Sequence, residues 1–204
     1  MEGERMRVLV ACEYSGIVRE AFKKRGHDAW SCDLLPTDIP GQHLEGDIMR
    51  FITERWDLMI AHPPCTYLSR AAGRWLYGGG KINQQRYKLG LMGKEFFMTL
   101  LNAPIEKVCI ENPTPFKIFK LPKYTQVVQP YEYGHKYSKR TLLWLKNLPI
   151  LMSTDIVKKH TPYLPSNTGG AKRGQKHSVG ISKNAKESSK TFQGIADAMA
   201  EQWG

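Results

Sequence analysis

Apolar residues recur along this chain with two spacings, one typical of buried strands and one typical of amphipathic helices. Three short segments, 6–11, 56–61 and 107–110, are rich in Val, Leu, Ile and Ala and show little polar alternation. Such runs are typical of strands that are buried on both faces of a sheet. Segment 28–32 is a shorter and more polar candidate. We therefore expect a strand at each of these four segments, with 56–61 central in the sheet.

Three other segments carry apolar residues at helical spacing. The first begins at Ile17 and ends at Gly26, a residue type common after helices. The second spans 84–101, and the third, 191–203, is expected to close the fold. The closing helix presents a single apolar face made by Phe192, Ile195, Ala196, Met199, Ala200 and Trp203.

The order of these elements predicts the fold class. A glycine-containing turn at 13–16 joins the first strand to the first helix, and the second strand ends at Asp33. Strand, glycine turn, helix, strand and acidic residue form the opening unit of nucleotide-binding α/β sheets. Further strand candidates at 124–129 and 139–145 place a sheet edge near Asn147. We expect an α/β fold whose mostly parallel central sheet is flanked by helices.

The domain organisation predicted for 1–204 is a single domain, because no repeat or long linker divides the chain. Segment 66–83 is rich in glycine and basic residues and is predicted to be a long mobile loop beside the site. Segment 165–190 is rich in Ser, Gly, Lys and Asn, and it is predicted to be a flexible basic stretch.

The net charge of the chain indicates which kind of partner to expect. The chain has 30 Lys and Arg against 19 Asp and Glu, a net charge of +11. A surplus of this size favours a polyanionic partner such as a nucleic acid, although a basic protein without such a partner is the alternative.

The four cysteines show no CxxC spacing and no accompanying histidine cluster, so we expect no metal site. The start of the chain has no apolar signal segment, and no run is long and apolar enough to span a bilayer. The expected location is a reducing cytoplasm, and no membrane partner is expected.

Two predicted strand ends carry unusual residues. The strand 56–61 continues directly into His62-Pro63-Pro64-Cys65, and the strand 107–110 continues into Glu111. Ligands of open parallel sheets bind outside the carboxyl ends of the strands, so both side chains are expected to face one crevice. A thiol and a carboxyl there suit addition to an electron-poor ring. A buried thiol and a salt-bridging carboxylate are the structural alternatives.

These residues resemble the DNA cytosine-C5 methyltransferase family, in its short bacteriophage form. The family places Pro-Cys after a central strand and Glu-Asn at the next strand end, and Pro64-Cys65 and Glu111-Asn112 match them in order. The resemblance extends from Val8 to about Arg140 and includes the closing helix. It implies a Rossmann-like S-adenosylmethionine-dependent methyltransferase fold.

The resemblance also implies a mechanism. The family flips the target cytosine out of double-stranded DNA. Cys65 would add to C6 of that base, and Glu111 would protonate N3. The activated C5 would then take the methyl group of S-adenosylmethionine, the implied cofactor. Glu111 needs its proton for part of this cycle, and we expect a partly desolvated pocket to favour the protonated form.

Fewer of the family's cofactor-binding residues have counterparts in this chain. Of the family's glycine-rich turn only Gly16 is kept, and Ser15 stands where the family has a glycine. Glu13 is expected to make a polar contact with the methionine part, and Pro63 to line the cofactor site. By the same resemblance Asp33 would bind the ribose hydroxyls.

Asp47 resembles the residue that reaches the adenine amino group in this family. Its alternative role is a helix N-cap, because Asp is one of the residue types preferred at that position. The sequence leaves these two roles open.

The family's arginine-bearing strand is degenerate here. Its positions fall on Lys139 and Arg140; we assign Arg140 a catalytic role and Lys139 a nucleic-acid contact, although either could reach the base or a phosphate. Arg70, Arg74 and Lys81 in the 66–83 loop are expected to bind phosphates. Two aromatic residues of that loop are candidates for stacking near the flipped base or for ordinary packing, namely Trp75 and Tyr77.

The length of the chain limits the sequence specificity that can be expected of it. Only 149–190 is available where the family usually inserts a target recognition domain, so relaxed sequence specificity is expected. Such an activity could protect phage DNA from restriction. Two alternatives remain open: a methyltransferase acting on RNA or free cytosine nucleotides, and a nucleic-acid-binding module without turnover.

Overall fold

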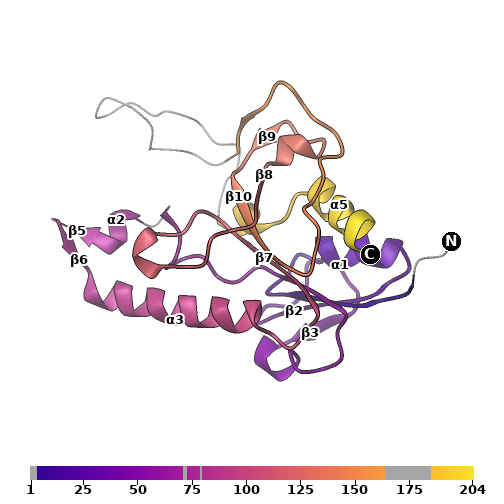
Figure 1. The fold of residues 1–204 in the computed structure, drawn as a ribbon, viewed down its shortest axis with the longest axis horizontal. Coiled ribbons are helices and arrows are strands. Elements are labelled where there is room, and N and C mark those ends of the chain that lie inside the picture. Colours follow the sequence, from indigo (N-terminus) through magenta and orange to yellow (C-terminus); the bar gives the residue numbers. More distant parts are fainter. Residues whose placement is uncertain (1–3, 71–72, 79, 164–184) are drawn as a thin grey trace.

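The protein forms one seven-stranded sheet in the order β3-β2-β1-β4-β7-β10-β8 (Figure 1). A computed structural model describes residues 4–70, 73–78, 80–163 and 185–204. The strands of this sheet are β1 (Arg7–Ala11), β2 (Asp28–Asp33), β3 (His43–Glu45), β4 (Leu58–Ala61), β7 (Lys107–Asn112), β8 (Gln126–Val128) and β10 (Thr141–Lys146).

Neighbouring strands are parallel from β3 to β7, whereas β10 is antiparallel to both β7 and β8. The chain progresses from β1 outward to β3 and then returns to the other side of β1 with β4. This reversal creates a topological switch point between β1 and β4, where open α/β sheets bind ligands. The predicted α/β class with a mostly parallel sheet is confirmed.

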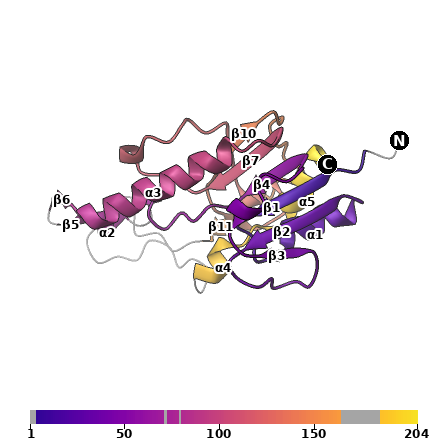
Figure 2. The same ribbon diagram turned by 90° about the horizontal axis from the view of Figure 1, so that it is seen from below.

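Helices cover both faces of the sheet. The long helices are α1 (Ile17–Lys24), α3 (Gln84–Leu101) and α5 (Gln193–Trp203). The short elements are α2 (Gly73–Leu76), α4 (Ala185–Ser189), η1 (Ile48–Arg50), η3 (Lys117–Phe119), η4 (Pro130–Glu132), β5 (Tyr77–Gly78), β6 (Lys81–Ile82), β9 (Tyr137–Ser138) and β11 (Thr161–Pro162). Figure 2 shows α2, β5 and β6 gathered beside the amino-terminal end of α3.

Alternation along the strands separates two apolar cores. Val8 and Val10 of β1 belong to the cluster beneath α1 and α5, whereas Leu9 and Ala11 belong to the cluster beneath α3. All four side chains are fully buried, as expected for a central strand with both faces covered. Within the described residues, no helix combines the length and apolar character needed to cross a bilayer.

The boundaries of α3 follow from its sequence. The Asn83 side chain accepts a hydrogen bond from Arg86 N at 3.0 Å and so caps the predicted first turn. Leu91 of this helix is 41% exposed, although it is apolar. The helix instead approaches Phe119 through Gly90, where a Cβ atom would overlap the phenyl ring.

The segment 66–83, which the sequence predicts to be a long mobile loop, is not wholly irregular in its described part. This segment contains α2 and the two-residue pairing of β5 with β6. The structure also adds β3, a three-residue edge strand that pairs with β2 and that hydrophobic periodicity could not reveal.

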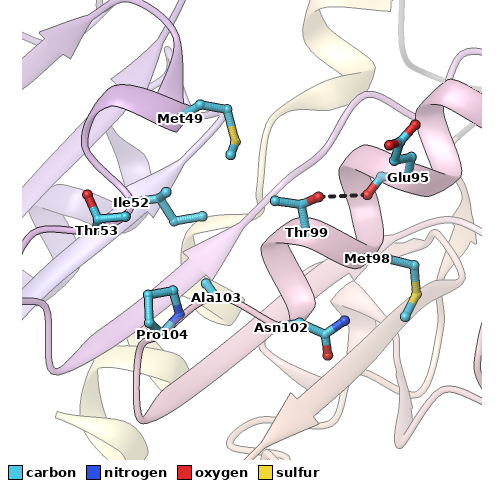
Figure 3. A pocket seen from close by; sticks show the side chains of 9 residues that line it. All are labelled: Met49, Ile52, Thr53, Glu95, Met98, Thr99, Asn102, Ala103 and Pro104. Atoms are coloured by element: carbon cyan, nitrogen blue, oxygen red, sulfur yellow. Dashed lines mark hydrogen bonds between the residues drawn. The ribbon is translucent and has the colours of Figure 1, made fainter.

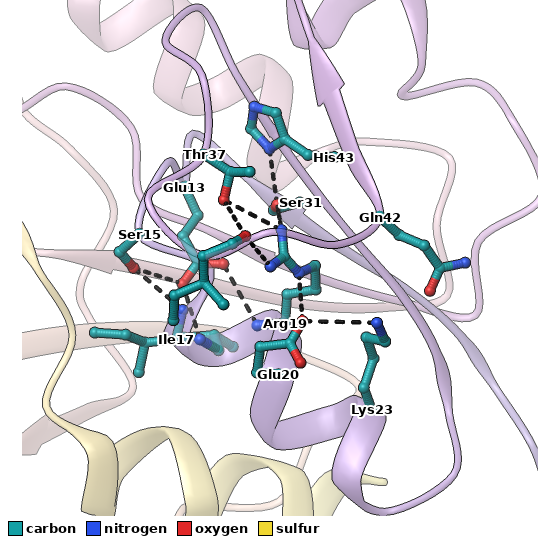
Figure 4. A network of polar contacts seen from close by, with 12 residues as sticks. Glu13, Ser15, Ile17, Arg19, Glu20, Lys23, Ser31, Thr37, Gln42 and His43 are labelled. Carbon is teal, nitrogen blue, oxygen red and sulfur yellow. Dashed lines mark hydrogen bonds and ion pairs between the residues drawn. The ribbon is translucent and has the colours of Figure 1, made fainter.

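Arg19 organises the loop that follows β2, although it lies on a helix whose pattern predicts a solvent-facing cation (Figure 4). Its guanidinium is fully buried and donates to Ser31 Oγ at 2.9 Å, Thr37 Oγ1 at 3.3 Å and the Ile39 carbonyl at 2.6 Å. Its Nε lies 2.9 Å from Glu20 Oε1. One buried side chain thus fixes the loop that borders the crevice.

Replacing Arg19 with methionine should lower the free energy of unfolding by about 3 kcal/mol, because it leaves several buried acceptors without donors. Arg25→Met is the matched control, since Arg25 pairs with Glu201 at 3.2 Å and both side chains are largely exposed. The control should lose at most about 1 kcal/mol. Equal shifts of the two variants in urea denaturation would show that the Arg19 network is not stabilising.

Candidate active site

The carboxyl ends of β4 and β7 hold the two predicted catalytic motifs together. The backbone of His62 continues the pairing of β4 with β1 by donating to the Ala11 carbonyl at 2.9 Å. Asn112 at the end of β7 donates its Nδ2 to the Pro63 carbonyl at 2.9 Å. The Pro-Cys and Glu-Asn segments are therefore bonded directly to one another, and Asn112 has a structural role that the sequence did not assign.

Cys65 begins a turn at the mouth of this site. Its carbonyl accepts from the backbone N–H groups of Leu68 at 3.1 Å and Ser69 at 2.9 Å. Burial and the nearby Glu111 carboxylate raise the pKa of the thiol, whereas Lys139 and a hydrogen bond from the Ser69 side chain oppose that rise. The thiol is partly exposed, so it can meet a substrate, but it needs these cationic and polar neighbours to become a nucleophile.

Glu111 has a partner that the sequence analysis did not name. His62 Nδ1 lies 3.0 Å from Glu111 Oε2, and the two side chains are only 10% and 17% exposed. Within the described residues, the buried His62 Nε2 has no hydrogen-bond partner, and Cys65 is therefore not bonded to it. This geometry differs from hydrolases in which a histidine serves as the base for a cysteine.

The pKa of the Glu111 carboxyl reflects influences of opposite sign. Desolvation acts to raise its pKa, but the hydrogen bond from His62 and the charges of His62 and Lys139 together outweigh it. The net direction is a lowered pKa. The expected effect of desolvation is therefore present but outweighed, because the fold brings a hydrogen-bond donor, His62, and a nearby cation, Lys139, to the same carboxylate.

Lys139 and Arg140 occupy different environments. Lys139 lines a small cavity with Glu111, Phe192 and other residues, and its charge acts on both Glu111 and Cys65. Arg140 is exposed and donates to the Tyr124 hydroxyl at 3.2 Å. Both residues lie just before β10, and within the described residues the hydrogen bond and ring contact of Arg140 are with Tyr124 and not with Glu111 or Cys65. The structure brings Lys139 to the predicted catalytic pair, and it does not bring Arg140 there.

Three of the predicted cofactor residues build the turn after β1 (Figure 4). Glu13 Oε1 accepts from Ser15 Oγ at 2.9 Å and from the backbone of Val18 at 2.8 Å. The Glu13 carboxylate thus caps the amino-terminal end of α1, where the helix dipole favours an anion. Gly16 has φ 75°, a left-handed conformation that suits glycine.

Asp33 and Asp47 lie together at the neighbouring strand ends. Asp33 Oδ1 accepts from the backbone of Leu35 at 3.0 Å, and Asp47 Oδ1 accepts from Met49 N at 3.0 Å. Asp47 is therefore the N-cap of η1, as its alternative role predicted. Burial, followed by the charges of Asp33, Cys32 and Asp47, raises the pKa of Cys12 to about 12. The two carboxylates accordingly form one acidic cluster beside the β1 turn.

The predicted phosphate-binding residues lie on or near the loop before α3. Arg70 and Lys81 are exposed, and the Arg70 backbone donates to the Thr114 carbonyl at 3.0 Å. Arg74 belongs to α2, but its side chain lies outside the described residues. Tyr77 packs edge-on against Phe116 with ring centroids 5.8 Å apart, which supports the packing alternative for this residue.

Only the end of the predicted flexible segment 165–190 is described. There, α4 lies against the β1 turn, because the Tyr14 hydroxyl donates to the Lys186 carbonyl at 2.8 Å. Lys186 and Lys190 each form an ion pair with Asp38, at 3.0 and 3.1 Å. The predictions for 164–184 lie outside the described residues. The described end borders the same crevice as the acidic cluster.

The closing helix, predicted correctly from its apolar face, fixes one wall of the site. Gly194 N donates to His135 Nε2 at 3.0 Å, and a Cβ atom at Gly194 would overlap the Tyr133 carbonyl. Phe192 packs against the His135 ring at 5.0 Å between centroids. This close approach keeps Phe192 over the cavity that Glu111 and Lys139 line.

Acidification should destabilise this contact. Burial lowers the pKa of His135 from its usual 6.5, against the opposing charge of Asp197. The unfolded chain then binds a proton at a higher pH than the folded protein, so stability is complete above 6.5 and is lost as the pH falls through the folded value. Urea midpoints measured between pH 7.5 and pH 5, roughly one unit either side of the ordinary histidine pKa, should show this fall.

His135→Gln is the comparison for that series, because an amide oxygen can still accept from Gly194 N without titrating. The variant should lose less stability on acidification than the wild type. It should keep some slope, since burial and Arg25 also lower the pKa of His27. A slope identical to that of the wild type would contradict the assignment.

A separate groove of about 520 Å³ lies between η1 and the carboxyl-terminal half of α3 (Figure 3). It is lined by Met49, Ile52, Thr53, Glu95, Met98, Thr99, Asn102, Ala103 and Pro104. None of the predicted site residues is among them, so this groove is distinct from the candidate active site.

Comparison with models of protein families and with curated proteins finds no match for this chain. Among the described residues, no group of three or more His, Cys, Asp or Glu side chains is arranged to hold a metal ion.

Proposed function

We propose that this protein is an S-adenosylmethionine-dependent DNA cytosine-C5 methyltransferase that uses Cys65 as its nucleophile. The observation that carries the proposal is the grouping of Cys65, Glu111 and Lys139 beside the switch point of a mostly parallel sheet. A thiol, a carboxyl and a cation are the groups that addition to C6 of cytosine and protonation of N3 require.

The residues beside this grouping suit the proposed cofactor. Asp33 and Asp47 offer carboxylate oxygens to hydroxyl and amino donors, and their negative charge suits a sulfonium. Because the carboxylate of Glu13 caps α1, the cofactor would meet the backbone of the turn at Ser15 and Gly16 rather than the Glu13 oxygens. The cofactor supplies the electrophilic methyl group when bound.

The proposed reaction balances at each step. The Cys65 thiolate forms a bond to C6 of the flipped base while Glu111 transfers its proton to N3. The electron-rich C5 takes the methyl group and S-adenosylhomocysteine is released. Solvent water then accepts the C5 proton while the Cys65 sulfur leaves as the thiolate, which restores the aromatic ring. N3 returns its proton to Glu111. Lys139 favours the thiolate before addition, because its positive charge lowers the pKa of Cys65.

Duplex DNA is the proposed substrate because the chain carries a net charge of +11 and exposes basic residues near the site. Arg70, Lys81 and Arg140 are the described side chains best placed to bind phosphates. Such contacts position DNA without selecting its sequence, which is consistent with relaxed specificity.

Incorporation of tritium from labelled S-adenosylmethionine tests the proposal. The protein should label cytosine-containing duplex DNA. Label on RNA or dCMP alone would identify the substrate as RNA or a nucleotide. DNA binding without label on any of the three would identify a binding module and contradict the enzymatic proposal.

Because Lys139 and Arg140 lie in different environments, their alanine variants should change different kinetic parameters. Lys139→Ala should lower kcat about tenfold or more, because it removes the charge that acts on Cys65 and Glu111. Arg140→Ala, the matched control, should mainly raise KM for DNA and reduce its salt dependence. Steady-state kinetics at two salt concentrations separate these effects, and the reverse pattern would reassign the catalytic cation to Arg140.

A further inference from the structure

The pair formed by His62 and Glu111 has a geometry that restricts which carboxylate oxygen can reach a substrate. His62 Nδ1 lies 3.0 Å from Oε2. Within the described residues, Oε1 has no hydrogen-bond donor. One oxygen of the carboxyl group is thus held from the β4 side, and the Glu111 side chain also lines the small cavity that Lys139 and Phe192 border.

We propose that His62 is a positioning residue for Glu111, whose Oε2 it holds so that Oε1 is the oxygen that exchanges a proton with N3 of the target cytosine. This inference rests on the proposed function. His62 lies outside the two motifs that carry the family resemblance, Pro64-Cys65 and Glu111-Asn112. Its positioning role is therefore inferred from the structure of this chain.

The placement of His62 is tightly determined. Its backbone N–H donates to the Ala11 carbonyl, and Pro63 follows it, so the main chain cannot shift without breaking the extension of β4. Its side chain is only 10% exposed. Among the residues that the structure describes, the buried imidazole Nε2 has no partner, a cost that the Nδ1–Glu111 contact offsets.

The protons balance in this arrangement. Before addition, Glu111 carries its proton on Oε1 while Oε2 accepts from the Nδ1–H of His62. Transfer of that proton to N3 leaves a carboxylate, and the same Nδ1–H then stabilises the negative charge. When Cys65 leaves C6, the N3 proton returns to Oε1. His62 itself gains and loses no proton, so it acts through Glu111 and does not touch the base.

Other charged groups also face Glu111, and a pH-dependent test has to include them. They are Lys139 just before β10, Cys65 in the turn after β4, and Cys109 two residues earlier on β7. Lys139 and His62 both lower the pKa of Glu111. Removing His62 alone should therefore raise that pKa while the contribution of Lys139 remains.

The test compares the pH dependence of methyl transfer in wild type, His62→Ala and His62→Asn. The reactive form has Glu111 protonated and Cys65 ionised, so its proton is on the more acidic of the two groups, because the pKa of Glu111 is lowered and that of Cys65 is raised. The population of this form is bell-shaped in pH, and its low-pH limb falls at the pKa of Glu111 while its high-pH limb falls at the pKa of Cys65. His62→Ala should lower kcat by about 10- to 100-fold, with KM little changed and the acid limb moved to higher pH. His62→Asn should restore most of the rate and the original limb, since its amide N–H can replace Nδ1–H.

Two outcomes would overturn the role of His62. One is a His62→Ala profile that coincides with the wild type, and the other is His62→Asn being as impaired as His62→Ala. An NMR measurement of the His62 ring nitrogens in the wild type removes any dependence on whether the alanine variant folds. The Nδ1 atom should carry a proton at neutral pH, and its resonance should change in Glu111→Gln.

The same experiments separate this inference from the proposed function. If the wild type transfers no methyl group to any substrate, the proposed function fails, and the NMR result still decides whether His62 holds Glu111. If the wild type is active but the Nδ1 resonance is unaffected by Glu111→Gln, only the inference about His62 fails.

Discussion

Replacing Cys65 with alanine should abolish methyl transfer, with a fall in rate of about 10⁴-fold or more, the scale on which enzymes lose activity without their nucleophile. Without the sulfur no bond to C6 forms, and C5 of cytosine remains too electron-poor to attack the methyl group. The fold should be retained because Cys65 is partly exposed and its structural contacts are made by its carbonyl oxygen. Tritium transfer and urea denaturation measure the two properties.

Cys109→Ala provides the matched control. Cys109 is fully buried in the apolar cluster beneath α1 and α5, where its thiol has a strongly raised pKa because of burial. Its loss should cost some stability and leave methyl transfer in place. Activity that survives Cys65→Ala but disappears with another cysteine would contradict the assignment of the nucleophile.

Glu111→Gln should lower kcat about 10²- to 10⁴-fold, because the amide keeps the size of the carboxyl but cannot transfer a proton to N3. The same substitution should also make the Cys65 thiol more reactive. The Glu111 carboxylate raises the pKa of Cys65, so its neutralisation should lower the thiol pKa. Free Cys65 should then react faster with iodoacetamide at neutral pH, even as methyl transfer slows.

Glu111→Asp is the comparison variant for this pair of measurements. It keeps the charge but withdraws the oxygens from His62 Nδ1 and from the base, so it should lose rate without the faster alkylation. Unchanged alkylation in Glu111→Gln would show that the carboxylate does not act on Cys65, and it would weaken the grouping on which the proposed function depends.

The sequence predicted most of the sheet because its central strands are short apolar runs. Alternate residues of β1, β4 and β7 are buried against two helical layers. Both faces of these strands must therefore be apolar, and the sequence shows this as short apolar runs. It also predicted α3 to its ends, where Asn83 forms the cap. β3 escaped prediction, because a three-residue edge strand with half-exposed side chains needs no apolar run.

The site was predictable where a motif specified it and unpredictable where packing did. Pro64-Cys65 and Glu111-Asn112 pointed to the correct strand ends, but the pairing of His62 with Glu111 depends on the register of β4 with β7. The histidine directly before Pro-Pro-Cys was the available signal for it. The choice of Lys139 over Arg140 depends on which side of β10 faces the cavity, and one residue of offset reverses it.

A duplex containing 5-fluorocytosine tests the central claim most directly. Fluorine at C5 cannot leave as the C5 proton does, so the enzyme should remain bound through sulfur after methyl transfer. Mass spectrometry of the digested protein should find a nucleotide adduct on the peptide containing Cys65, dependent on S-adenosylmethionine and absent in Cys65→Ala. An enzyme that methylates ordinary DNA but forms no adduct, or forms it on another cysteine, would contradict attack by Cys65.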